Sequence, residues 1–410
     1  MKKTDIALIG LGYVGLPLAL AFAKRYHVVG FDVDGKKCNN LKKGLVSRDQ
    51  CDATKLRNAL DHGNFHITNK LNDTKACNYY IIAVPTPVSK DYHADPTLLK
   101  KACEMVGQVI GKDDTVVIES TVWPGMTEEI CVPILEKVSG LKLNTDFFVG
   151  YSPERINPGD SQHPVERIKK IVSGSTPATA TALEKLYGSI LLNGTYKAPC
   201  IRVAEASKVM ENCQRDVLIA FANEMHNIFS ALGINTEDVI AAASTKWNFI
   251  PMHPGLVGGH CIPVDPYYLI DKADTVGIDA RLLKTARSVN NNMAIDYAHR
   301  IADKLRRSGG TSVLLLGFAF KPNCDNIRNT RVADVYNELK KTVSDITICD
   351  PLIDVEKAKE SYGITVVHSL PSNKSYDVIA VTTAHDIFSR DAFLHIEHKP
   401  IMHLCEKTTE

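Results

Sequence analysis

A short segment from Val257 to Pro266 gathers residue types that can carry covalent chemistry on a carbonyl carbon. Its sequence, VGGHCIPVDP, combines two glycines, a histidine, a thiol at Cys261 and a carboxylate at Asp265. A thiol adds to an aldehyde to give a hemithioacetal, and glycines allow a substrate close to the backbone. An inert core thiol is the default interpretation of any one cysteine, but this setting favours a nucleophile at Cys261.

A glycine motif near the N-terminus predicts a dinucleotide site. Gly10, Gly12 and Gly15 form the pattern GxGxxG between an apolar run, IALI, and an expected helix over 17–25. Glycines at this spacing permit a tight turn and the close approach of a pyrophosphate, whose charge the N-terminus of the helix attracts. A lone GxGxxG is a weak signal, but its place between a strand and a helix makes it specific.

The cofactor is indicated by an acidic residue further along. Asp32 closes the next expected strand, at the position where such sites place a ribose-binding carboxylate. A carboxylate there accepts hydrogen bonds from ribose hydroxyls and repels a 2′-phosphate. The sequence therefore favours NAD over NADP, although Lys37 lies nearby.

The elements that must position these residues alternate between strands and helices. This pattern predicts an α/β chain with two Rossmann-like, doubly wound domains, the second opening near Ser312. A stretch from about Val203 to Leu232, without Pro or Gly, predicts a long helix in a central helical domain. We expect domains at 1–198, 199–305 and 306–410. The expected strands cover 6–9, 28–32, 79–84, 115–119, 147–151, 313–320, 346–350 and 377–381, and a further helix covers 332–341.

Composition excludes several classes of function. The 410 residues carry 48 Lys and Arg against 47 Asp and Glu, so no global field attracts nucleic acid or an anionic membrane. The 11 cysteines lack zinc spacing and indicate reduced thiols. Lys2 and Lys3 before an apolar stretch imitate a secretory signal, but Asp5 and three glycines interrupt it. We expect a folded N-terminus, no membrane insertion and a cytoplasmic protein.

Several separated motifs together resemble the UDP-glucose/GDP-mannose dehydrogenase family. The resemblance covers essentially the whole chain and implies two oxidations of a sugar alcohol by NAD, with Cys261 as the nucleophile. The motifs that carry it are GLGYVGLPLA at 10–19, VPTP at 84–87, ESTV at 119–122, SPER at 152–155, Ala206-Ser207-Lys208 through Asn212, GGHCIPVDP at 258–266, and GFAFK at 317–321 with Arg328.

The resemblance also implies a role for each site residue. Lys208 and Asn212, whose spacing puts them on one helix face, would stabilise negative charge on the reacting oxygen. Asp265 would assist proton transfer, and Thr121 and Glu154 would position water. The implied catalytic residues are Cys261, Lys208, Asn212, Asp265, Glu154 and Thr121. The implied cofactor contacts are Gly10, Gly12, Tyr13, Val14, Gly15, Asp32, Lys37, Thr86, Thr121 and Arg328. The implied substrate contacts are Glu154, Arg155, Lys208, Asn212, Gly258 and Lys321.

Some of these residues have a simpler explanation. Lys208 and Asn212 could lie on a solvated helix face, and Glu154, which follows a proline, could cap a helix. His260 could shape its loop without transferring protons, and we leave it outside the catalytic set.

Two departures from the family pattern bear on the substrate. Members that act on UDP-glucose often carry SPEFLxEG, whereas this chain reads SPERINPG, with Pro158 in place of the second acidic residue. They also tend to carry an arginine upstream of the cysteine, where this chain has TKWNF at 245–249. The combination is similar to the branch that acts on UDP-N-acetylhexosamines.

The resemblance thus implies a homodimer that oxidises C6 of UDP-N-acetylglucosamine to the uronic acid, for surface polysaccharide. Each substrate would consume two NAD⁺ and one water, through a thiohemiacetal and a thioester at Cys261. The same chemistry on UDP-N-acetylgalactosamine, UDP-N-acetylmannosamine or UDP-glucose is the alternative. A rival of another class is a dinucleotide-binding regulator without turnover, against which the complete set of catalytic residues argues.

Overall fold

The computed structural model describes residues 3–46, 53–155, 165–370, 374–389 and 401–403. The chain divides into two compact units, which are described separately. The first comprises 1–211 and 267–277, and the second 212–266 and 278–410.

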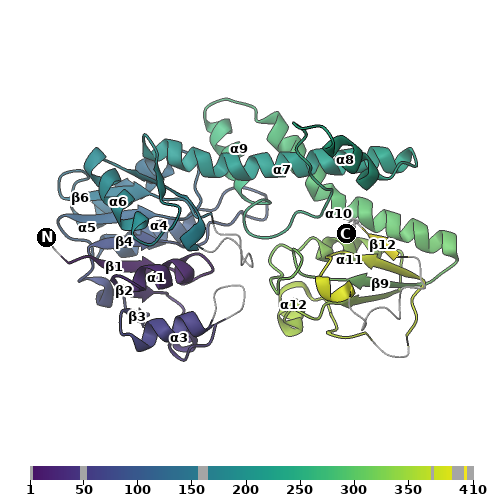
Figure 1. Cartoon of the computed structure of the whole chain (residues 1–410), viewed down its shortest axis with the longest axis horizontal. Coiled ribbons are helices and arrows are strands. Elements are labelled where there is room, and N and C mark those ends of the chain that lie inside the picture. The colour runs from purple at the N-terminus through teal and green to yellow at the C-terminus, as the bar shows by residue number, and fades with distance from the viewer. Residues whose placement is uncertain (1–2, 47–52, 156–164, 371–373, 390–400, 404–410) are drawn as a thin grey trace. The chain divides into compact units, whose positions relative to one another are not determined.

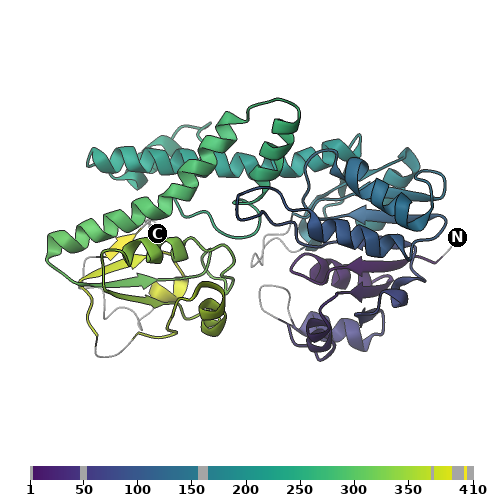
Figure 2. The ribbon, with the colours of Figure 1, turned by 180° about the vertical axis from the view of Figure 1, so that it is seen from behind.

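A predominantly parallel sheet forms the centre of the first unit (Figures 1 and 2). Its strand order is β3-β2-β1-β4-β5-β6-β7-β8, and only the β6–β7 pair is antiparallel. Six strands in the order 3-2-1-4-5-6 are the arrangement of a Rossmann fold. The strands are β1 (Asp5–Ile9), β2 (His27–Phe31), β3 (Phe65–Thr68), β4 (Tyr79–Ile82), β5 (Asp114–Ile118), β6 (Phe147–Tyr151), β7 (Lys170–Gly174) and β8 (Thr195–Lys197).

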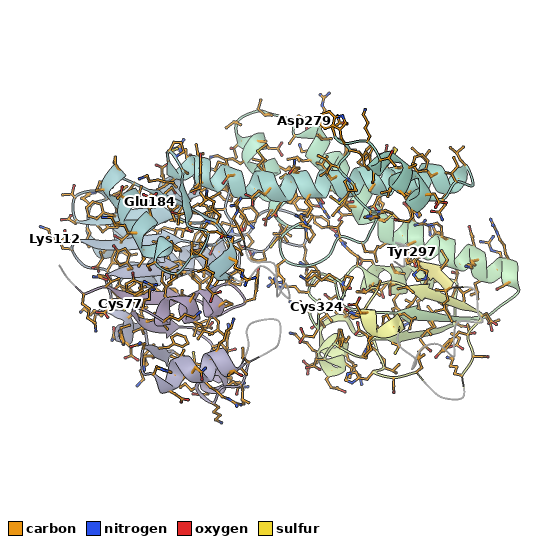
Figure 3. All side chains as sticks on the ribbon, viewed as in Figure 1. Cys77, Lys112, Glu184, Asp279, Tyr297 and Cys324 are labelled. Atoms are coloured by element: carbon orange, nitrogen blue, oxygen red, sulfur yellow. The ribbon has the colours of Figure 1, made fainter. Side chains whose placement is uncertain are left out.

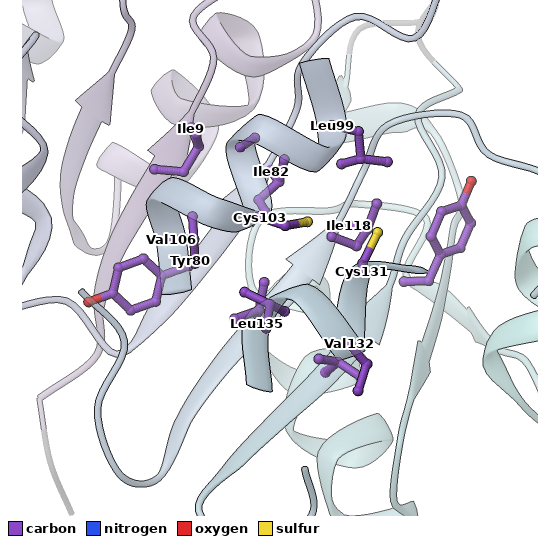
Figure 4. Close-up of a cluster of buried hydrophobic side chains, with 14 of the residues drawn as sticks. Ile9, Tyr80, Ile82, Leu99, Cys103, Val106, Ile118, Cys131, Val132 and Leu135 are labelled. Carbon is purple, nitrogen blue, oxygen red and sulfur yellow. The ribbon is translucent and has the colours of Figure 1, made fainter. Parts of the chain in front are cut away.

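Two apolar clusters fill the two faces of this sheet. Neighbouring residues of β4 belong to opposite clusters. Ile82 packs with residues of α4 and α5 (Figure 4). Ile81 packs with residues of α1 and α6 on the other face. Such burial on both faces explains why the strands read as continuous apolar runs. The helices are α1 (Gly15–Ala23), α2 (Gly35–Lys42), α3 (Ala53–Asp61), α4 (Thr97–Gly107), α5 (Val132–Ser139) and α6 (Pro177–Gly188), with shorter turns η1 (Leu71–Thr74), η2 (Thr127–Cys131) and η3 (Val165–Arg167).

A long helix, α7 (Ile201–Ala231), leaves the first unit and continues into the second. It begins two residues before the predicted range and ends one residue before its end. One of its companions in the second unit, α8, begins with a polar cap, Asn235, whose side chain accepts hydrogen bonds from two amides of the first turn. These companions are α8 (Thr236–Ser244) and α10 (Arg281–Ser308), and α9 (Asp265–Thr275) returns to the first unit.

A second, parallel sheet of order β10-β9-β11-β12 lies in the second unit. The hydroxyl of Tyr297 on α10 donates to the Val381 carbonyl, 3.1 Å away, and so ties the helix to this sheet (Figure 3). The two sheets and the helices between them confirm the predicted fold class. The elements are β9 (Ser312–Leu316), α11 (Val332–Leu339), β10 (Asp345–Cys349), α12 (Val355–Tyr362), β11 (Val378–Val381), η4 (Asp386–Ser389) and β12 (Ile401–His403).

Several predicted boundaries were wrong. The strand expected over 313–320 ends at Leu316, because Gly317 turns the chain with a φ of +93°. The helix expected from Pro17 begins at Gly15, since proline is accommodated in a first helical turn. The helix expected over 332–341 ends at Leu339.

Candidate active site

The glycine turn after β1 has the close packing that a dinucleotide site requires. Gly10 has a φ of +95°, and its amide donates to the Phe31 carbonyl at 2.8 Å. A Cβ at Gly15 would lie only 1.9 Å from the Gly10 carbonyl oxygen, whereas one at Gly12 would meet nothing within 4 Å. Gly10 and Gly15 therefore shape the turn, and Gly12 leaves open space beside it.

The residues around this turn also fit a bound dinucleotide. Val14 precedes α1 without a side-chain cap, and Tyr13 is partly exposed beside it, so the helix N-terminus can receive a phosphate. Asp32 is nearly buried, and its Oδ2 accepts a hydrogen bond from the Leu11 amide at 2.9 Å. The Lys37 ammonium lies 2.7 Å from the same oxygen. Lys37 is thus ion-paired with the carboxylate that we expect to contact ribose.

Two further expected cofactor contacts follow neighbouring strands of the same sheet. Thr86 comes after β4 and Thr121 after β5, and both are partly exposed. The Ser120 hydroxyl donates to the Val84 carbonyl at 2.7 Å and so joins the two segments. Arg328, by contrast, belongs to the second unit, and its expected contact with the cofactor stays a prediction.

Charged side chains gather at the edge of the first sheet where β5 and β6 end. Ile118 pairs with Tyr151 across these strands, so Thr121 and Glu154 each follow the paired position by three residues. β7 runs antiparallel to β6 and brings its first residue, Lys170, to the same edge. The Lys170 ammonium donates to Glu119 Oε2 at 2.7 Å and lies 3.7 Å from Glu154 Oε2.

Burial in this cluster shifts ionisation equilibria. Burial raises the pKa of Glu119 to about 7, the nearby Lys170 ammonium opposes this shift, and the Glu154 carboxylate adds to it. Burial also disfavours charge on Lys170, but the two carboxylates outweigh it and raise the pKa of Lys170. The sequence motif ESTV drew attention to Thr121, whereas Glu119 and Lys170 had no predicted role.

Arg155, an expected substrate contact, has protein partners in the same unit. Its guanidinium forms a forked ion pair with Glu211 of α7 and donates to the Lys169 carbonyl at 2.9 Å. Its amide donates to Glu154 Oε1 at 2.6 Å. Pro158, on which the comparison with UDP-glucose enzymes depends, lies outside the described residues.

Lys208 and Asn212 lie one turn apart on α7, as their spacing predicts. Lys208 is buried, with 7% of its surface exposed, so it does not lie on a solvated face. The Asn212 side-chain amide donates to the carboxylate of Asp265, which is itself 2% exposed. The structure therefore brings Asn212 and Asp265, which are 53 positions apart, into one hydrogen-bonded pair.

Cys261 lies four residues before α9, on a tightly packed loop. Its carbonyl accepts hydrogen bonds from the amides of Val264 (3.0 Å) and Asp265 (2.8 Å), and its side chain is partly exposed. Gly259 has a φ of +90°, and a Cβ there would lie 2.7 Å from the Phe320 ring. At Gly258 a Cβ would lie 2.8 Å from the Asn329 carbonyl oxygen. Larger residues would displace this loop.

Side chains from distant segments of the second unit hold the loop in place. The Asn223 amide group clamps Gly255, accepting from its amide at 2.7 Å and donating to its carbonyl at 3.1 Å. Asn329 donates to the Gly259 carbonyl at 2.8 Å. Sequence reasoning missed these supports, although the recurrence of polar residues on the α7 face through 212, 216 and 223 was a usable signal.

The remaining predicted residues lie near this loop in the second unit. His260 contacts Asn326 at 3.2 Å and packs edge-on against Phe320, which fits a role in shaping the loop. The Lys321 ammonium lies 5.6 Å from the centroid of the Phe320 ring. Within the described ranges no group of three or more His, Cys, Asp or Glu side chains could hold a metal ion.

These observations define a class of protein. A Rossmann-like sheet with an open dinucleotide turn and a carboxylate at the end of β2 is the architecture of an NAD-binding oxidoreductase. A partly exposed thiol with a buried Asn–Asp pair in the adjoining helices is compatible with chemistry at a carbonyl carbon.

The chain belongs to the UDP-glucose/GDP-mannose dehydrogenase family. Its NAD binding domain model matches residues 4–191, the central domain model 202–292, and the UDP binding domain model 314–403. The protein is thus an NAD-dependent member of a nucleotide-sugar dehydrogenase family, as the motifs predicted.

Individual relatives are similar over nearly the whole chain. UDP-N-acetyl-D-glucosamine 6-dehydrogenase from Pseudomonas aeruginosa is 48% identical over 95% of this chain and 92% of its own. The protein of the same name from Salmonella typhi is 48% identical over the same shares. A solved UDP-D-ManNAc dehydrogenase from Pyrococcus horikoshii superposes with a TM-score of 0.85 at 30% identity, covering 98% of this chain and 94% of that one. In the described segments no helix is long and apolar enough to cross a membrane.

Proposed function

We propose that this protein is a UDP-N-acetyl-D-glucosamine 6-dehydrogenase that oxidises the C6 alcohol to a carboxylate. The similarity to two relatives of that name, each 48% identical over 95% of the chain, carries the proposal. The segments SPERINPG and TKWNF support an N-acetylhexosamine over glucose.

The proposed reaction consumes two NAD⁺ and one water per sugar and releases two NADH, the carboxylate and three protons. The glycine turn at 10–15 and Asp32 would hold NAD⁺, which would supply the hydride acceptor for each of the two oxidations. Between them the Cys261 sulfur bonds to C6 of the aldehyde and gives a thiohemiacetal, whose oxidation leaves a thioester. Attack of water on the thioester carbon breaks the C–S bond and returns the thiol.

Each proposed role fits the local surroundings of its residue. Lys208 supplies a buried positive charge, and Asn212 an amide already oriented by Asp265, for an oxygen on the reacting carbon. Asp265 exchanges protons with groups at the nucleophile. Glu154 and Thr121, which extend from neighbouring strands, orient the water. Gly258 lets the loop that carries Cys261 pass close to the Asn329 carbonyl. We propose that Gly258, Arg155 and Lys321 contact the substrate.

We also propose how the chain is divided into domains and how it assembles. We place domain boundaries at 1–198, 199–305 and 306–410, and the extents of the three family models support them. A homodimer is supported by apolar side chains that α7 exposes in the second unit, among them Phe221 and Ile228. We also propose a cytoplasmic enzyme that supplies surface polysaccharide.

A panel of UDP-sugars tests the substrate. The purified enzyme is assayed for NADH formation with UDP-N-acetylglucosamine, UDP-N-acetylgalactosamine, UDP-N-acetylmannosamine and UDP-glucose, with Cys261→Ala as the background. We expect the highest kcat/KM with UDP-N-acetylglucosamine. A preference for UDP-glucose would refute the substrate but not the chemistry, and no NADH with any sugar would favour the regulator without turnover.

A further inference from the structure

Four ionisable side chains meet in the interior of the first unit, beside the proposed water-orienting residue. Each comes from a different element and is almost excluded from solvent, with exposed fractions between 0 and 7%. They are Glu119 after β5, Glu154 after β6, Lys170 at the start of β7 and Tyr187 on α6.

The ammonium of Lys170 is the centre of this cluster. It donates to Glu119 Oε2 at 2.7 Å and to the Pro153 carbonyl at 3.1 Å, and it lies 3.7 Å from Glu154 Oε2. An ammonium has three N–H donors. Two are used by Glu119 and Pro153, and the third can serve Glu154. Lys170 therefore holds both the backbone just before Glu154 and the carboxylate itself.

The other two members hold Lys170 in its place. Tyr187 donates to Glu119 Oε1 at 2.5 Å, so each oxygen of this carboxylate has a partner. The Tyr187 ring also lies 5.5 Å from the Lys170 ammonium, within the range of a cation–π contact. Among the described residues these are the charged and titratable groups that face Lys170 from β5, β6 and α6.

Stability alone does not account for such an arrangement. Removing an ammonium and two carboxylates from water is costly, and buried ion pairs can often be replaced by apolar residues without loss of stability. A cation that also contacts the backbone before Glu154 instead defines where that carboxylate lies. An ionised carboxylate is the form that can accept a proton from water or from an alcohol.

We propose that Lys170 is a positioning residue for Glu154, held in place by Glu119 and Tyr187. The inference rests on the proposed function, in which Glu154 orients the reacting water. Lys170 divides its charge between two carboxylates. When Glu119 is protonated, the ammonium serves Glu154 alone. When Glu119 is ionised, it competes with Glu154 for the same cation.

Opposite effects of two variants test this proposal. Lys170→Met keeps most of the side-chain length but removes the cation that stabilises negative charge on the neighbouring carboxylates. The acid limb of the kcat–pH profile should move to higher pH, and kcat at neutral pH should fall about tenfold. Glu119→Gln removes the competing carboxylate, so the acid limb should move to lower pH. The KM for the UDP-sugar should stay within about twofold in both, since Lys170 and Glu119 are each only 1% exposed.

A double variant and a substrate-free measurement complete the test. Lys170→Met/Glu119→Gln should return the acid limb toward that of the wild type. Infrared spectra of the wild type should show a protonated-carboxyl band that titrates near neutral pH, that Glu119→Gln abolishes and that Lys170→Met moves to higher pH. If Lys170→Met does not fold, Tyr187→Phe should move the limb in the same direction as Glu119→Gln, by less.

The outcomes distinguish a failure of the proposed function from a failure of the proposed role of Lys170. A wild type that forms no NADH with any UDP-sugar refutes the proposed function, and the infrared titration alone then judges the Lys170–Glu119 coupling. If the wild type is active, two results would refute the role of Lys170. The acid limb of the kcat–pH profile could stay fixed in all variants, or it could move in the same direction for Lys170→Met and Glu119→Gln.

Discussion

Asp32 and Asp350 occupy the same position in the two sheets but have different surroundings. Each follows the strand next to the first strand of its sheet, and each accepts a hydrogen bond from an amide of the adjacent glycine turn, Leu11 for Asp32 and Phe318 for Asp350. Asp350 is also 3.1 Å from His385 and fully buried, whereas Asp32 faces Lys37 near the surface. The first carboxylate can reach a ligand and the second is fixed within the fold.

This difference gives the first prediction. The wild-type enzyme should use NAD⁺ with a much higher kcat/KM than NADP⁺, because a carboxylate facing a 2′-phosphate costs on the order of several kcal/mol. Asp32→Asn removes this charge repulsion. It should therefore lower the ratio of kcat/KM for NAD⁺ to kcat/KM for NADP⁺ by about tenfold or more. Asp350→Asn is the matched control and should leave the ratio unchanged. Equal use of both cofactors by the wild type would show that Asp32 does not select NAD⁺.

Cys261 carries the second prediction. A wild type that forms a thioester should release two NADH per sugar and yield only the acid. Cys261→Ser offers a poorer nucleophile and a poorer leaving group, so substrate-derived mass should accumulate on the protein, as intact mass spectrometry can show. Cys261→Ala should form no adduct and no acid. Acid formation by Cys261→Ala at a near wild-type rate would exclude covalent catalysis by this thiol.

Much of the architecture could be predicted because it is encoded locally. The glycine turn at 10–15, the strand and helix alternation and the loop that carries Cys261 each depend on residues close together in sequence. The predicted elements are present with less accurate ends, but the strands β3, β7, β8 and β12 were not predicted. Gly317, for instance, ends its strand through a positive φ that apolar periodicity cannot reveal.

The supports of the site could not be predicted in this way. Lys170 meets Glu119 across 51 positions because β7 runs antiparallel to β6, and nothing in the local pattern of either strand gives that direction. Arg155 meets Glu211 across 56 positions, through a helix whose charged residues read as solvated. Such pairings depend on topology, which a single sequence specifies only through the complete fold.

Glu119 carries a prediction about stability. Its pKa in the folded protein is raised to about 7 by burial, above the ordinary value of 4.5. A carboxyl group raised in this way favours the folded state below about pH 4.5, and this contribution is lost as pH rises through about 7. The free energy of unfolding of the wild type minus that of Glu119→Gln should therefore fall by up to about 3 kcal/mol across this window. Urea titrations at several pH values check it, and a difference that rises with pH would contradict it.

The last prediction concerns Gly259. Substitutions there can distinguish the effect of backbone strain from the effect of packing in the loop that carries Cys261. Gly259→Ala places a side chain at a φ of +90° and a Cβ 2.7 Å from the Phe320 ring. We expect a loss of stability beyond the ~1–2 kcal/mol of a left-handed residue, together with a fall in kcat because the loop shifts Cys261. The control Gly363→Ala also has a positive φ, +68°, but its Cβ meets nothing within 4 Å, so it should lose about 1 kcal/mol and keep its kcat. Adding Phe320→Ala to Gly259→Ala should recover part of kcat if the ring contact displaces the loop. Equal losses of kcat in Gly259→Ala and Gly363→Ala, measured with the wild-type substrate, would show that packing against Phe320 does not set the position of Cys261.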